Sequence, residues 1–181
     1  MKELKYYTIA GIIFVILTGS LAHFLYDWSG NNDIIGLFTP VNESVWEHMK
    51  LLFFPMLLYS LIMTFRFQKD FPCMISALCW GILSGTWTIP VLFYAYKALL
   101  GKDLFIMDIG IFILSILLAF WLSYKLSLSC RTKRYTPLPC SLLCILFLCF
   151  LLFTYHPPSG KIFDNPVPHT NTMDRLLISF E

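Results

Sequence analysis

The sequence is short of charged residues. Of its 181 residues, 13% are Asp, Glu, Lys or Arg, whereas 57% are hydrophobic. A soluble domain of ordinary composition carries about 25% charged residues. A shortage of this size excludes an ordinary soluble domain and indicates a protein that crosses a membrane several times. The net charge is only +2, and the lack of a basic patch argues against a nucleic-acid partner.

Long apolar runs take the place of the missing charge. A membrane-spanning helix needs about 20 predominantly apolar residues. Five segments come close to this length or exceed it, at residues 6–26, 48–65, 74–98, 104–126 and 138–155. We therefore predict an all-α, polytopic membrane bundle of five transmembrane helices, formed by residues 1–155 as one domain in the cell membrane. Residues 156–181 are rich in proline and polar side chains, so we predict an irregular tail.

The basic residues indicate which way the bundle faces, because Lys and Arg gather on the cytoplasmic side of membrane proteins. With the N-terminus inside, eight basic residues fall on the cytoplasmic side, namely Lys2, Lys5, Arg66, Lys69, Lys125, Arg131, Lys133 and Arg134. The outer side receives five, namely Lys50, Lys97, Lys102, Lys161 and Arg175. We predict an inside N-terminus and an outside C-terminus. The first segment also has signal-peptide features, but its apolar run continues to Tyr26, so we expect an uncleaved helix.

The cysteines give no sign of a disulfide framework. Six are present, and none falls in a predicted outer loop. Disulfides persist in oxidising compartments, so we predict no structural disulfide.

Acidic residues and histidines gather at the predicted outer side. All four histidines belong there, together with nine of the 11 acidic residues. Charged groups at membrane depth are costly, so they usually line a cavity, pair with one another or bind ions.

Two helix ends carry these groups at a spacing of four residues, which places them on one helix face. His23 and Asp27 end the first segment, and Glu43 and Glu47 precede the second, beside His48. The two helices are consecutive and antiparallel, so their outer ends should be neighbours. Mixed nitrogen and oxygen ligands suit a divalent ion, above all zinc. We predict a metal site made of His23, Asp27, Glu43, Glu47 and His48, with Asn42, Asp108 and His156 as further candidates.

Helix capping is the structural alternative for part of this pattern. Thr39 and Pro40 are typical of an N-cap followed by a first helical residue. Ser44-x-x-Glu47 matches a capping box. A cap accounts for one acidic residue, but not for two acidic residues and a histidine.

Three stretches carry a resemblance to a known family: HFLYDWSGNN, GLFTPVNESVWEHMKLLFFP and YHPPSGKIFDNP. They resemble a family of small bacterial membrane proteins, mostly from Firmicutes, catalogued as domain of unknown function 6512. The resemblance covers the whole chain and implies a multi-pass membrane protein, but no activity. The tail departs from the family pattern, because VPHTNT stands where a glycine-rich stretch is expected, so His169 receives no role.

These observations favour a metal-dependent membrane hydrolase that acts on a lipid or another membrane-adjacent substrate. Zinc with an open coordination position activates water, and a carboxylate then serves as the general base. We predict that Glu47, or else Glu43, is this base. One alternative is a small transporter or ion-binding protein, although the inner helix halves offer mostly Ser, Thr and Cys. Another is a structural or accessory protein, in which the polar groups only join the first two helices.

Overall fold

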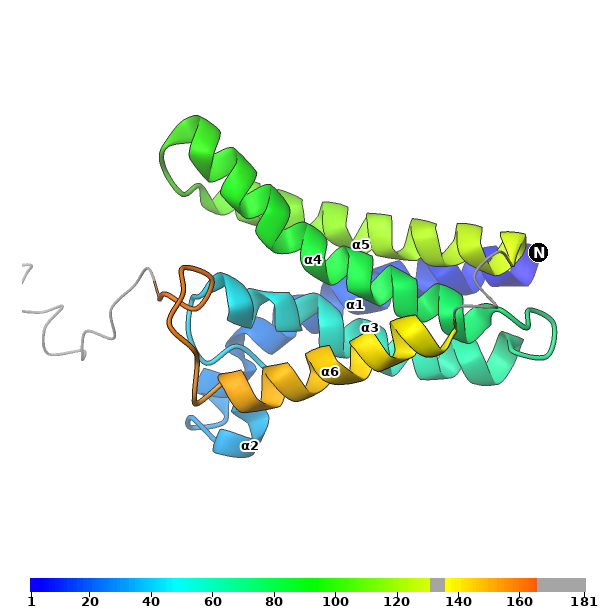
Figure 1. Cartoon of the computed structure of the whole chain (residues 1–181), viewed down its shortest axis with the longest axis horizontal. Coiled ribbons are helices and arrows are strands. Elements are labelled where there is room, and N and C mark those ends of the chain that lie inside the picture. The colour runs from blue at the N-terminus through cyan, green and yellow to red at the C-terminus, as the bar shows by residue number, and fades with distance from the viewer. Residues whose placement is uncertain (131–135, 166–181) are drawn as a thin grey trace, which may run out of the picture.

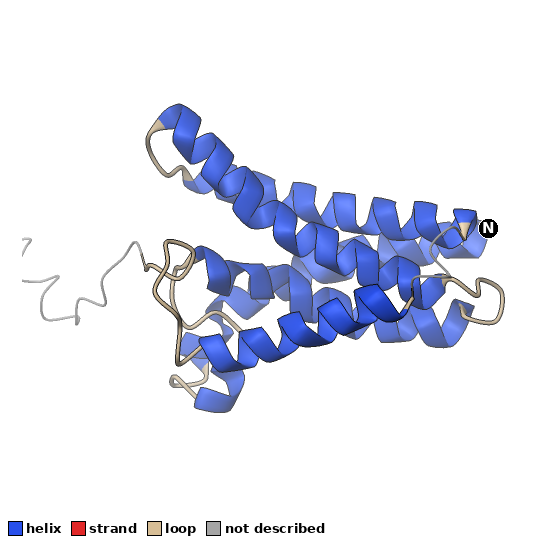
Figure 2. Ribbon diagram, in the orientation of Figure 1, coloured by secondary structure: helices blue, strands red, loops and turns tan. Residues whose placement is uncertain are grey.

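The computed structural model describes residues 1–130 and 136–165, and every element in these ranges is a helix (Figures 1 and 2). The helices are α1 (Lys2–Trp28), α2 (Asp33–Gly36), α3 (Val45–Phe67), α4 (Met74–Leu100), α5 (Phe105–Ser129) and α6 (Pro137–Phe153). The all-α membrane bundle predicted from composition is confirmed.

Within the described residues, four helices, α1, α3, α4 and α5, are long and apolar enough to cross a membrane. The fifth predicted span corresponds to α6, which has only 17 residues. At about 1.5 Å per residue it is about 26 Å long, slightly less than the roughly 30 Å thickness of a bilayer's hydrocarbon core. The number of five spans, like the orientation, stays a prediction.

The core lies around α3 and α4, whereas α1 and α5 form much of the outer surface. Met49, Leu52 and Phe53 of α3 are fully buried. In contrast, α1 exposes Ile9, Ile13, Leu17 and Leu21 at helical spacing along one face. An exposed apolar stripe of this kind is what a lipid-facing helix requires.

Glycines allow the closest helix contacts. A side chain at Gly19 of α1 would collide with the backbone carbonyl of Leu51 in α3. A side chain at Gly81 of α4 would collide with Ser123 and with the carbonyl of Ala119 in α5. Small residues let membrane helices approach this closely, and dispersion contacts then hold them together.

The prediction of no disulfide is wrong, because Cys73 and Cys130 are joined by one. Cys73 precedes α4 and Cys130 follows α5, so the antiparallel packing of these helices brings together residues 57 positions apart. The bond lies at the end that charge distribution predicts to be cytoplasmic. A disulfide is more typical of an oxidising compartment, so the two indications of orientation disagree.

The opposite end of the bundle is where α2, the start of α3 and the end of α6 meet (Figure 1). The Tyr155 hydroxyl donates to the carbonyl of Asp33 (2.8 Å), and the Trp46 amide donates to the carbonyl of Ile162 (3.0 Å). The described part of the tail therefore returns to the bundle beside α3. Residues 166–181 of the predicted tail, including His169, lie outside the described residues.

Candidate functional site

The segment before α3 decides where the acidic residues point. Ser44 is the N-cap of α3, and its hydroxyl accepts a hydrogen bond from the Glu47 amide (3.3 Å). The prediction of an N-cap at Thr39 is wrong, because the chain turns through a loop until residue 44. Glu43 therefore precedes the helix, whereas Glu47 lies in its first turn. The two carboxylates do not share a helix face.

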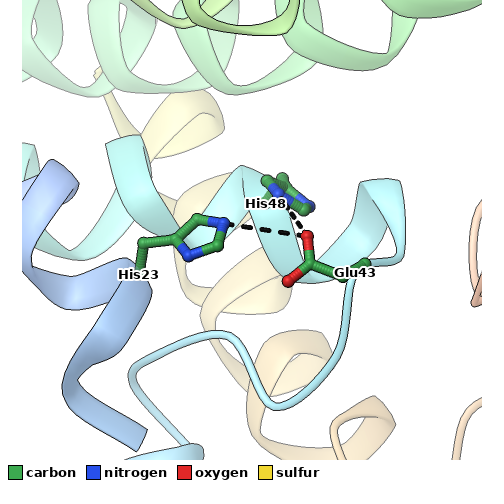
Figure 3. A group of neighbouring side chains, drawn as sticks. All are labelled: His23, Glu43 and His48. Atoms are coloured by element: carbon green, nitrogen blue, oxygen red, sulfur yellow. Dashed lines mark ion pairs between the residues drawn. The ribbon is translucent and has the colours of Figure 1, made fainter. Parts of the chain in front are cut away.

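His23, Glu43 and His48 come together at this end of the molecule (Figure 3). Glu43 Oε2 lies 3.3 Å from His48 Nε2 and 3.7 Å from His23 Nε2. One ligand atom from each residue lies within 4.8 Å of the other two. We call these three residues the His–Glu cluster. It joins the last turns of α1 to the loop before α3 and to the first turn of α3.

Backbone bonding orients the His48 ring. Its Nδ1 lies 2.9 Å from the carbonyl oxygen of Ser44, which can only accept a hydrogen bond. In the neutral ring, Nδ1 therefore carries the proton, and Nε2 directs its lone pair toward Glu43. Two acceptors facing each other need a proton or a metal ion between them. The geometry thus suits either an imidazolium–carboxylate pair or a metal site.

Glu43 is held in its charged form. The hydrogen bond from His48 is the largest influence and lowers the pKa of Glu43 below its ordinary value. Partial burial acts in the opposite direction, while the positive charges of His48 and His23 lower the pKa further. Glu43 is therefore a carboxylate at neutral pH, as metal binding or ion pairing requires.

Glu47 points away from the cluster and into the protein. Its Oε2 lies 2.7 Å from Lys50 Nζ and also accepts the Val41 amide at 3.0 Å. Both side chains are inaccessible to solvent, with 2% of Glu47 and 0% of Lys50 exposed. We call Glu47 and Lys50 the buried pair. The structure does not bring Glu47 to the predicted metal site.

The other predicted residues also lie outside the cluster. Asp27 is exposed one turn beyond His23, and His156 is exposed after α6. The Asn42 side chain accepts the Ser44 amide (2.9 Å), which shapes the loop. Asp108, in the first turn of α5, accepts a 2.6 Å hydrogen bond from the Tyr96 hydroxyl.

Lys50 is an important residue that sequence patterns do not single out. Its charge marks it only as an outer basic residue, although Glu47 and Lys50 have the i, i+3 spacing of a helical ion pair. That spacing was the available signal. It does not show that both side chains are buried.

Comparison with known proteins identifies the family. The Family of unknown function (DUF6512) matches residues 1–170, so the chain belongs to this family. No curated protein and no solved structure matches the chain.

Proposed function

We propose that this member of the DUF6512 family binds a divalent metal ion, with zinc as the first choice, through His23, Glu43 and His48. The observation that carries the proposal is the convergence of two imidazole nitrogens and one carboxylate oxygen within 4.8 Å. Two histidines and a glutamate form the ligand set of a well-known class of catalytic zinc sites.

The separations support this choice of ligands. Two ligands of a tetrahedral zinc ion lie about 3.4 Å apart, because each bond is about 2.1 Å long. The distances from Glu43 Oε2 to the two histidine nitrogens are 3.3 and 3.7 Å. The two histidine nitrogens lie within 4.8 Å of each other, so side-chain rotations would have to bring them closer for all three atoms to bind one ion.

A zinc ion held by these three residues would supply activated water, because bound zinc lowers the pKa of its water to about 7. We therefore propose a metal-dependent hydrolase. The site lies at the end of membrane helices, so the proposed substrate is a membrane lipid or another molecule at the membrane surface.

A hydrolase also needs a group that removes a proton from the attacking water. The Glu47 carboxylate is engaged by Lys50 and by the Val41 amide. Glu47 is therefore not available as the general base while it pairs with Lys50, and we propose no other described residue for that role.

Metal analysis of the purified protein tests the binding step. We expect about one Zn²⁺ per chain in the wild type. His23→Ala and Glu43→Gln should each abolish stoichiometric binding, whereas His156→Ala, a change to an exposed histidine outside the cluster, should not. Sub-stoichiometric zinc in a supplemented wild type would overturn the proposal.

Hydrolysis needs its own measurement. Release of fatty acid or headgroup from phospholipid–detergent micelles should depend on added Zn²⁺ and should fall in His23→Ala, which removes a proposed ligand. A zinc-loaded protein that releases neither product would contradict the lipid hydrolase and leave the metal site standing.

A structural role is the second candidate, because the same distances also suit ion pairs. In that case, protonated His23 and His48 would hold Glu43 and join α1 to α3 without a metal. The zinc analysis separates the two candidates, because ion pairs alone bind no zinc.

A further inference from the structure

The buried pair contacts the backbone of the segment that leads to Glu43. Lys50 Nζ donates to the carbonyls of Gly36 (3.1 Å) and Thr39 (3.4 Å). Glu47 Oε2 accepts the Val41 amide (3.0 Å). Two side chains of α3 therefore hold this segment at three points, from the end of α2 to two residues before Glu43.

The same pair also reaches α6. Lys50 Nζ donates to the Thr154 hydroxyl (2.6 Å), which itself donates to the carbonyl of Phe150 (2.6 Å). Gly36 permits the close approach of the end of α2 to the residues that follow α6, because a side chain at this position would collide with Tyr155 and Val41. The segment is thus enclosed between α3 and the end of α6.

This anchoring matters because Glu43 lies before the N-cap of α3 and is not itself part of a helix. Glu43 lies in the loop, so its place opposite His23 and His48 depends on the path of residues 36–44. Zinc ligands must stand about 2.0–2.2 Å from the ion, and the groups that orient ligands typically change metal affinity 10- to 100-fold.

We infer that Glu47 and Lys50 are positioning residues: they anchor residues 36–41 and so hold Glu43 at the His–Glu cluster. The inference rests on the proposed function, since it treats Glu43 as a metal ligand. It assigns to Glu47 an indirect role in place of the direct one that its sequence position predicts.

The test uses the double variant Glu47→Gln/Lys50→Met in detergent micelles. Both charges are removed together, because a single change leaves the other charge buried without a partner. We expect backbone amides of residues 37–44 to exchange with deuterium about tenfold faster or more. Zn²⁺ affinity, measured by calorimetry, should fall about 10- to 100-fold.

Two further variants sharpen the test. Gly36→Ala places a methyl group against the side chains of Tyr155 and Val41 while leaving both charges of the buried pair in place. We expect it to shift the segment, and therefore to raise amide exchange and weaken Zn²⁺ binding. Lys97→Met removes the exposed ion pair with Asp103 (2.9 Å) and is the matched control. It should leave amide exchange in residues 37–44 and Zn²⁺ affinity unchanged.

The outcomes separate this inference from the proposed function. Unchanged amide exchange in the double variant and in Gly36→Ala would overturn the anchoring. Faster exchange with unchanged Zn²⁺ affinity would overturn the positioning role. A wild type that binds no Zn²⁺ contradicts the proposed function and the ligand role of Glu43, whereas amide exchange still supports or overturns the anchoring of residues 36–41.

Discussion

The His–Glu cluster and the buried pair lie at the start of the same helix but in opposite surroundings. The side chains of the cluster are 30–48% exposed. The side chains of the buried pair are at most 2% exposed. Glu43 and Glu47 are four residues apart, yet one faces two histidines near the surface and the other faces a lysine inside. Burial, rather than residue type, separates a group available to a ligand from one that holds the fold.

The difference in burial also predicts that the two groups contribute differently to the free energy of unfolding. Taking two charges out of water costs several kcal/mol per ion, and close pairing with further hydrogen bonds must offset that cost. The two charges of the buried pair lie 2.7 Å apart. They also make further hydrogen bonds with Gly36, Thr39, Val41 and Thr154. Exposed ion pairs are screened by water and contribute about 0–1 kcal/mol.

The largest effect is expected from breaking the buried pair. Lys50→Ala should lower the free energy of unfolding by about 3–5 kcal/mol, because it leaves the Glu47 carboxylate buried without its partner. Reversible unfolding in mixed micelles measures this change. Glu47→Gln/Lys50→Met should recover most of the loss. A Lys50→Ala protein as stable as the wild type would show that the pair does not stabilise the fold.

A much smaller effect is expected from the cluster. In metal-free protein, Glu43→Gln should change the free energy of unfolding by no more than about 1 kcal/mol, because the ion pairs it removes are partly exposed. The same unfolding measurement, made with a chelator present, checks this value. A loss as large as that of Lys50→Ala would mean that the comparison drawn from burial is wrong.

The smallest effect is an acid-dependent loss of the Glu43 interactions. The pKa of Glu43 is lowered from 4.5, chiefly by the hydrogen bond from His48. Any stability from Glu43 is therefore fully present above the ordinary glutamate pKa and is lost as the pH falls through the lowered value. Carboxyl NMR of metal-free protein should show Glu43 titrating below the ordinary glutamate pKa, and His48→Ala should raise the pKa of Glu43. Identical titration in both proteins would contradict the proposed contact.

Much of the fold follows from local sequence. The apolar runs predict the helices, and the exposed stripe of Ile9, Ile13 and Leu17 follows from helical spacing. The start of α3 was harder to place, because Thr39-Pro40 and Ser44-x-x-Glu47 are both good capping patterns. Only the second is used, with Ser44 as the N-cap. Local patterns cannot choose between such starts when loop contacts decide the outcome.

Only part of the candidate site could be predicted, because local patterns do not show which segments contact one another. His23, Glu43 and His48 do meet, as expected of the ends of consecutive antiparallel helices. Asp27 shares α1 with His23 but is exposed one turn beyond it, and Glu47 points into the protein. The i, i+4 rule places two residues on one face only when both lie in the helix, and Glu43 does not. The Cys73–Cys130 bond was missed because it depends on how α4 and α5 pack.

The sequence by itself determined that the protein is helical and suited to a membrane, because hydrophobicity and helical spacing are properties of single segments. It also determined which end would collect histidines and carboxylates. Only the tertiary structure decided what each carboxylate does. Whether a charge is solvated or buried, and which partner meets it, depends on contacts between segments as far apart as Lys50 and Thr154.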